Sequence, residues 1–86
     1  MISKQILRSG TSIGANINEA LYAESKKDFI HKMSISLKEA SETEYWLLLL
    51  KSTDFIDTKS YDSINSDCTE ILKILTTIVK NAKIRE

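Results

Sequence analysis

Proline, glycine and cysteine are scarce in this chain of 86 residues, and each scarcity excludes a class of structure. There is no proline and there are 2 glycines, which is too little turn chemistry for a multi-stranded β fold. The single Cys68 cannot form an intrachain disulfide, and it excludes a cysteine-based zinc site. What remains is one small domain, residues 1–86, with an all-α fold.

Long apolar runs are also lacking. The longest run, Tyr45 to Leu50, has 6 residues, whereas a helix that crosses a bilayer needs roughly 20. The first residues do not contain the apolar stretch of a signal peptide. We therefore predict a cytoplasmic protein that has no membrane partner.

Neither sign of charge dominates, because the chain has 12 basic and 12 acidic side chains and a formal net charge of zero. A globally basic nucleic-acid binder is thereby excluded, although a local basic patch is not. The charges are unevenly distributed along the chain. Residues 1–38 carry 6 basic and 3 acidic side chains, residues 39–72 carry 2 and 8, and residues 73–86 carry 4 and 1. The domain should therefore have a basic pole and an acidic pole.

Hydrophobic residues make up 42% of the chain and recur at helical spacing in three segments. We predict helices over residues 3–23, 26–51 and 58–84. The last segment has the most regular apolar stripe, with Asp57 as its N-cap. The middle segment opens at Ser25 with the Ser-x-x-acid form of a capping box, and its stripe is interrupted at Thr43 or Glu44. The short connections predict an antiparallel up-down bundle.

The first segment is less regular. Its apolar residues fit one helical face, but Gly10 and Gly14 each weaken a helix by on the order of 1 kcal/mol. Either these glycines let a neighbouring helix approach closely, or they mark a kink or a late helix start. We predict a helix that is irregular near Gly14.

Three helices are too few to cover the apolar surface of this chain. The run from Tyr45 to Leu50 surrounds its helix, because successive side chains lie about 100° apart. We therefore predict a homo-oligomer with Tyr45, Trp46 and Leu49 partly in the contact between subunits. The alternative is a tight monomer with an unusually deeply buried middle helix.

An up-down bundle places the start of the middle helix beside the end of the last helix. A candidate nucleic-acid site therefore gathers six cations at one pole: Lys26, Lys27, Lys32, Lys80, Lys83 and Arg85. Lysines beside the free backbone N–H groups of a helix start can bind phosphate. The alternative is that these lysines are simply solvated.

Three polar residues lie near the apolar stripes: Asn16, Glu19 and Glu42. We predict that they form hydrogen bonds between helices. A carboxylate metal site that also includes Glu39 is a weaker hypothesis. A di-iron bundle site needs Glu-x-x-His pairs on two helices, and His31 is the only histidine.

The sequence offers no nucleophilic triad, Walker loop or dinucleotide fingerprint. No catalytic residue, metal or cofactor is therefore predicted, and we expect that the protein is not an enzyme.

Two longer runs carry a family resemblance. Residues 7–20, LRSGTSIGANINEA, and residues 28–47, from Asp28-Phe29-Ile30 to Tyr45-Trp46-Leu47, resemble bacterial four-helix-bundle proteins first noticed in intervening sequences of 23S ribosomal RNA genes. The resemblance implies an up-down four-helix bundle that assembles into a homopentamer. It also implies kinship with accessory proteins of diversity-generating retroelements, which bind nucleic acid.

This chain departs from the family pattern at its start. Family members usually carry another helix before the position of Ile2, so we expect three helices here and an open groove where the additional helix would pack. Two functions follow as hypotheses. The first is an oligomeric, non-enzymatic bundle that binds RNA or DNA through its basic pole. The alternative is a protein-interaction module whose open groove takes a helix from a partner.

Overall fold

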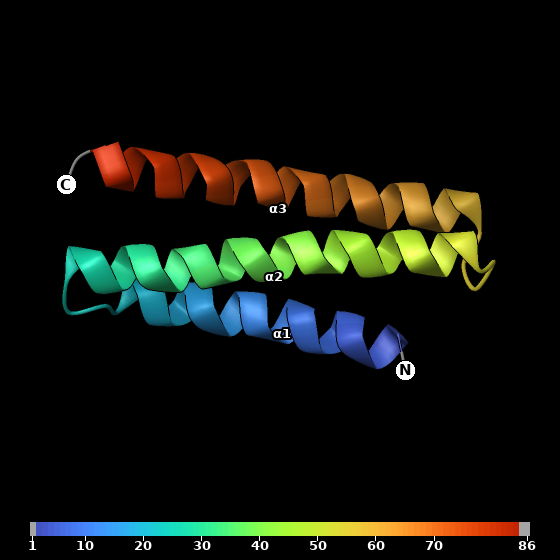
Figure 1. Cartoon of the computed structure of the whole chain (residues 1–86), viewed down its shortest axis with the longest axis horizontal. Helices are drawn as coiled ribbons and strands as arrows, with labels where there is room; N and C mark the ends of the chain where they lie inside the picture. Colours follow the sequence, from blue (N-terminus) through green and yellow to red (C-terminus); the bar gives the residue numbers. More distant parts are fainter. Residues whose placement is uncertain (1, 85–86) are drawn as a thin grey trace.

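The computed structural model describes the backbone of residues 2–84, and the side chains of these residues except 2, 3 and 5. It contains three helices: α1 (Ile2–Leu21), α2 (Lys26–Ser52) and α3 (Thr58–Ile84). Consecutive helices run antiparallel, and α2 lies between α1 and α3 (Figure 1). The described part of the chain is therefore an all-α up-down bundle, which confirms the predicted fold class.

Local signals in the sequence set the starts of α2 and α3. The Ser25 Oγ accepts a hydrogen bond from the Asp28 backbone N–H at 3.0 Å. The Asp57 Oδ1 accepts one from the Ser60 N–H at 2.7 Å. Each bond satisfies a backbone donor that has no partner within its helix.

The end of α2 lacks the usual glycine. Asp54 adopts φ 60°, the left-handed conformation that glycine most often supplies after a helix. Its N–H donates to the Lys51 carbonyl at 3.1 Å, and the Phe55 N–H donates to the Leu50 carbonyl at 3.0 Å. This pair of bonds is a Schellman motif, and it turns the chain into the connection to α3.

Neither a close approach of another described helix nor a late helix start explains the α1 glycines. The helix runs without interruption through Gly10 and Gly14, so they mark neither a break nor a late start. A Cβ added at either position would meet no atom within 4 Å beyond its chain neighbours and its own helix backbone, so no other described helix approaches them closely. One contact between α1 and α2 is made instead by Ser36, a small buried residue that reaches the Ile13 carbonyl.

One seam of α2 forms the floor of the core. Its members recur at steps of three and four residues: Ile30, Met33, Ser36, Ala40, Thr43 and Leu47. Thr43 does not interrupt the seam, because its side chain is buried and its Oγ1 donates to the Glu39 carbonyl at 2.9 Å. Ser36 is fully buried and its Oγ donates across the interface to the Ile13 carbonyl at 3.1 Å.

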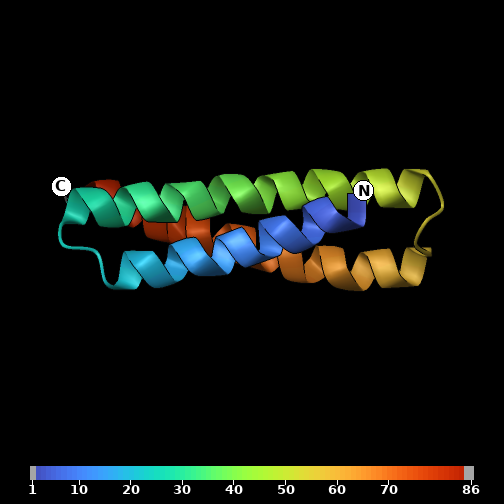
Figure 2. The same cartoon turned by 90° about the horizontal axis from the view of Figure 1, so that it is seen from below.

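The two outer helices both pack on α2 but not on each other. Within residues 2–84, no Cα of α1 lies within 8 Å of a Cα of α3. This is the geometry of a square four-helix bundle in which three corners are filled, since helices on a diagonal do not touch. In addition, α1 begins well short of the end of α2, so it does not cover the last turns of α2 (Figure 2).

Candidate functional site

An apolar groove runs between α1 and α3 above the seam of α2. It contains a hollow of about 220 Å³ lined entirely by apolar side chains: Ile17, Met33, Ile71, Ile74, Leu75 and Ile78. All three helices contribute to it, as they would contribute to the core of a bundle. The difference is that none of the described residues covers the fourth side of this core.

The wall formed by α3 explains why the groove remains apolar. One stripe of α3, which includes Cys68, Leu75 and Val79, is buried against α2. A second stripe carries isoleucines with exposed fractions of 45% at Ile64, 41% at Ile71 and 52% at Ile74. The predicted single stripe is thus two adjacent stripes, and only one of them is buried within this chain. Contiguous exposed apolar surface of this kind marks an interaction site.

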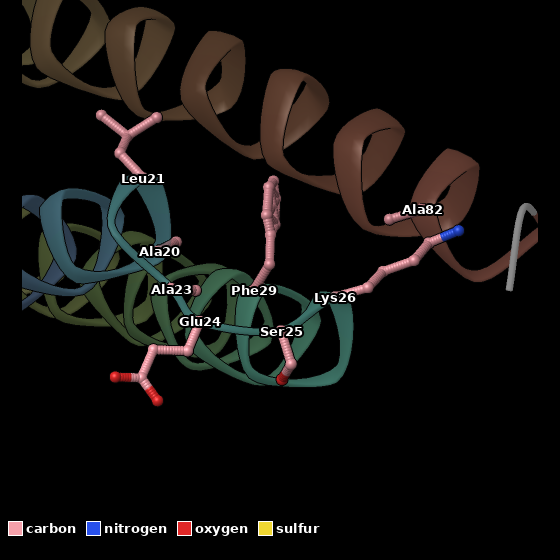
Figure 3. Close-up of a pocket in the computed structure, with 8 residues that line it drawn as sticks. All are labelled: Ala20, Leu21, Ala23, Glu24, Ser25, Lys26, Phe29 and Ala82. Carbon is pink, nitrogen blue, oxygen red and sulfur yellow. The ribbon is translucent and has the colours of Figure 1, made fainter.

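The groove continues to the end of the bundle where α2 begins. A second hollow of about 600 Å³ is lined by Leu21, Phe29 and Ala82, among others. These residues lie four positions, or about one helical turn, beyond Ile17, Met33 and Ile78. The Phe29 ring points from α2 toward α3, and the Lys26 side chain extends to the last turns of α3 (Figure 3).

The same end of the bundle brings together most of the predicted cations. Lys26 and Ala82 line one hollow, so the first turn of α2 and the last turn of α3 meet. Lys26, Lys27, Lys80 and Lys83 are all exposed there. We call these four residues the basic pole. Arg85, also predicted for this site, lies outside the described residues.

Lys32 lies further along α2 than the basic pole. It is partly buried, and its Nζ forms an ion pair with the Glu19 Oε2 at 3.2 Å. The pair connects α1 to α2, although the Glu19 side chain is 57% exposed and forms an ion pair instead of the buried interhelical hydrogen bond expected of it. Because the Lys32–Glu19 ion pair is partly exposed to solvent, its contribution to the stability of the fold is modest.

The other predicted interhelical polar residues do not bridge helices. The Asn16 Nδ2 donates to the Ser12 carbonyl of its own helix at 2.9 Å, and Glu42 is exposed. Within the described residues, no three His, Cys, Asp or Glu side chains are grouped closely enough to hold a metal ion. The carboxylate metal hypothesis therefore has no geometric support there.

Apart from the Lys32–Glu19 ion pair, the polar contacts between helices come from residues that the sequence interpretation did not select as interhelical. Besides the Ser36 bond, the Thr69 Oγ1 donates to the Glu44 Oε2 at 3.3 Å, and the Cys68 Sγ donates to the Ala40 carbonyl at 3.5 Å. Desolvation, with a smaller contribution from the Glu44 carboxylate, raises the pKa of the Cys68 thiol. Cys68 is thus a core residue. The only sign of this in the sequence is its position on the apolar stripe of α3.

The predicted subunit contact lies on the side of α2 that faces away from its buried seam. Tyr45 is 57% exposed, whereas Trp46 and Leu49 are half-buried. The Tyr45 and Trp46 rings meet edge to face, with centroids 5.3 Å apart. Leu48 adds a further exposed apolar side chain at 50%. These residues are a second apolar surface, separate from the groove.

Comparison with known proteins identifies the family. The model of the 23S rRNA-intervening sequence protein family matches residues 1–77. This chain belongs to that family. The resemblance seen in the sequence is confirmed, whereas kinship with retroelement accessory proteins stays a prediction.

A solved structure of a family relative supports the same conclusion. The chain is similar to a protein of unknown function from the S23 ribosomal protein family of Bacteroides thetaiotaomicron, with 62% sequence identity and a TM-score of 0.90. The match covers 93% of this chain and 71% of the relative. The comparison with curated proteins finds no match. Among the described residues, no helix is long and apolar enough to span a membrane.

Proposed function

We propose that this family member is a non-catalytic module that binds an amphipathic helix of another chain in its open groove. The observation that carries this proposal is that the described residues leave the fourth side of the bundle core unfilled, with no α1 Cα within 8 Å of an α3 Cα. Helix-in-groove binding uses this kind of surface, because the apolar face of the ligand helix replaces the missing core layer.

The isoleucines of α3 supply much of the driving force for docking. Ile64, Ile71 and Ile74 are each about half exposed in the free chain. Full burial of such a side chain contributes about 1.5–3 kcal/mol, so covering the exposed half contributes on the order of 1 kcal/mol for each. Because these three isoleucines lie along one stripe of α3, a helical ligand can cover all of them with one face.

A matched pair of substitutions tests the groove. Ile74 and Leu48 are about equally exposed, at 52% and 50%, but Leu48 lies outside the groove. We expect a fluorescein-labelled synthetic helix, with leucine at the a and d positions, to bind wild type and Leu48→Lys but not Ile74→Lys. Fluorescence anisotropy measures the binding. Equal binding by all three proteins, or by none, would contradict the proposal.

A second function, nucleic-acid binding, is favoured by the basic pole. Lys26 and Lys27 of α2 and Lys80 and Lys83 of α3 come from distant parts of the sequence and gather at one end of the bundle. Several copies in a homo-oligomer would multiply these phosphate contacts, as expected for binding to an RNA or DNA backbone.

The salt dependence of RNA binding tests this second function. We expect a structured RNA to bind at low salt, and the slope of log K against log salt to fall by about two in Lys26→Glu with Lys27→Glu. Lys38→Glu is the control, because Lys38 is exposed on α2 away from the pole. The absence of binding at low salt, or an unchanged slope, would exclude the basic pole as a nucleic-acid site.

A further inference from the structure

Another hollow lies between α2 and α3, outside the groove. It measures about 490 Å³, and six side chains of these two helices line it: Ser41, Glu44, Tyr45, Leu48, Tyr61 and Asn65. None of them belongs to α1 or lines the groove, so this hollow is independent of the surface between α1 and α3. We call it the tyrosine pocket, because each helix contributes one tyrosine to its wall.

The polar lining of the tyrosine pocket is rich in hydrogen-bond acceptors. The Glu44 side chain is partly buried, and its Oε2 accepts a hydrogen bond from the Thr69 Oγ1 at 3.3 Å. An ionised carboxylate has roughly four lone-pair sites and no donor. Glu44 can therefore accept further hydrogen bonds from a ligand while it keeps the bond to Thr69.

Asn65 supplies a second acceptor. Its Oδ1 is buried and has no hydrogen-bond donor among the described residues. A buried acceptor without a donor costs free energy. The last side-chain torsion of asparagine is broad and roughly two-fold, so the amide can turn this oxygen toward the pocket that Asn65 lines. A ligand with several donors is therefore favoured.

The aromatic rings of the pocket favour positive charge. A cation over an aromatic ring is attracted by the negative face of the ring. The Lys51 Nζ already lies 4.6 Å from the centroid of the Tyr61 ring. Tyr45 is mostly exposed, and none of the six lining residues is basic. A cationic ligand can thus make with Tyr45 the contact that Lys51 makes with Tyr61.

Other ligand classes fit these groups less well. The Glu44 carboxylate repels anions, and an apolar ligand would leave both acceptors without a donor. Within the described residues, no three His, Cys, Asp or Glu side chains are grouped closely enough to hold a metal ion. Among organic cations, a guanidinium fits better than an ammonium, because it carries five N–H donors in a planar fork and stacks on aromatic rings.

We infer that the tyrosine pocket binds a guanidinium group, which donates hydrogen bonds to the Glu44 carboxylate and the Asn65 Oδ1 and stacks on the Tyr45 ring. This site goes beyond the proposed function, because it involves neither the groove nor the basic pole. The group can come from a free guanidinium compound or from an arginine side chain. Arg8 is exposed on α1, so a second copy of the chain is one source.

Two small compounds that differ in charge test the site. N-acetyl-arginine amide carries the guanidinium, and N-acetyl-citrulline amide is its neutral isostere. Titration followed by NMR should shift the signals of Tyr45 and Asn65, and wild type should bind the arginine compound roughly tenfold more tightly. N-acetyl-lysine amide should bind more weakly than the arginine compound. Absence of arginine binding, or equal binding of any two of these compounds, would overturn the inference.

A matched pair of variants locates the binding. Glu44→Gln should remove the preference for arginine over citrulline, while the glutamine oxygen still accepts from Thr69. Glu42→Gln is the control and should keep the preference, because Glu42 is exposed on α2 and does not line the pocket. Circular dichroism verifies that both variants fold. A preference that survives in Glu44→Gln, or disappears in Glu42→Gln, would overturn the inference.

A third variant changes binding in the opposite direction. Lys51→Met removes a like charge beside the pocket, so the arginine compound should bind roughly twofold more tightly at low salt. A substitution that merely disturbed the fold would weaken binding. Weaker binding by a folded Lys51→Met protein would therefore contradict the inferred position of the guanidinium.

Sedimentation separates the two sources of the guanidinium. If Arg8 of a second copy occupies the pocket, Arg8→Gln, Glu44→Gln and the arginine compound should each lower the particle mass. Lys4→Gln is the control, because Lys4 is exposed beside Arg8. If a free compound is the ligand, the mass stays constant while the arginine compound binds. Either result supports the site, and failure of the titration overturns it whatever the mass.

Discussion

Serine and alanine side chains, rather than the glycines, are the small buried residues of α1 and α2. Ser36 and Ala40 are completely buried on α2, and Ser9 and Ala20 are nearly so on α1. A serine hydroxyl fits this position because it can donate to a backbone carbonyl of the facing helix, as Ser36 does to Ile13. The glycines of α1 instead lie on its exposed side.

The exposed glycines lead to a prediction about stability. Neither Gly10 nor Gly14 has positive φ, and neither has a neighbour that a methyl group would touch. Replacing each with alanine should therefore raise the free energy of unfolding by about 0.5–1 kcal/mol, because alanine favours the helix. Urea denaturation followed by circular dichroism measures the change. A loss of stability would show that another surface already packs against these positions.

The end of α2 and the start of α3 each have a helix-capping residue whose effect on stability can be tested. At the end of α2, Asp54 occupies a left-handed position, with φ 60°, that suits glycine. We expect Asp54→Gly to raise the free energy of unfolding by about 0.5–1 kcal/mol. Thr53→Gly is the matched control, because φ is −98° there and the substitution should destabilise. Urea denaturation of both variants is the measurement, and a destabilised Asp54→Gly would contradict the turn geometry.

At the start of α3, a helix cap links stability to pH. Hydrogen bonds from Ser60, the backbone N–H first, hold the pKa of the Asp57 carboxyl below its usual value of 3.8. A carboxyl with a lowered folded pKa stabilises the protein above its unfolded pKa. This stabilisation is lost as the pH falls from about 3.8 through the lower folded value.

Asp57→Asn keeps a capping side chain but removes the titration. Urea unfolding between pH 5 and pH 3 should therefore show a smaller loss of stability in this variant than in wild type. The effects of other carboxyl groups are common to both proteins and cancel in the comparison. Identical pH dependence would mean that the cap does not contribute to acid destabilisation.

At the scale of the whole molecule, the chain exposes two separate apolar surfaces. One is the groove between α1 and α3, and the other includes Tyr45 and Leu48 on the far side of α2. A bundle with extents of 44 × 21 × 14 Å is too thin to cover both. This follows from its architecture, because the backbones of the two outer helices do not come within 8 Å of each other and the middle helix supplies most of the core.

The prediction of self-association rests on the second apolar surface, which includes Tyr45 and Leu48. Sedimentation should give a mass that is a multiple of 9.8 kDa, and Tyr45→Lys should lower it. Phe55→Lys is the control, because Phe55 is 76% exposed in the connection between α2 and α3. A folded wild-type particle of 9.8 kDa at every concentration would refute the predicted subunit contact. The resemblance implies a pentamer, and the same measurement gives the subunit number.

The sequence by itself determined the helical fold and the family, because both depend on local information. Apolar spacing indicates helices, the caps at Ser25 and Asp57 mark two starts, and the motif residues identify the family. The turn at Asp54 was not apparent from the sequence, because an aspartate, and not the usual glycine, adopts the left-handed conformation there.

Only the tertiary structure decided which apolar residues are core and which are surface. The isoleucines of α3 lie on the same broad face of the helix as Cys68 and Leu75, so the pattern alone cannot separate the two stripes. The separation depends on where α1 and α2 lie around α3. That placement is set by packing between segments distant in sequence, and it leaves the groove open.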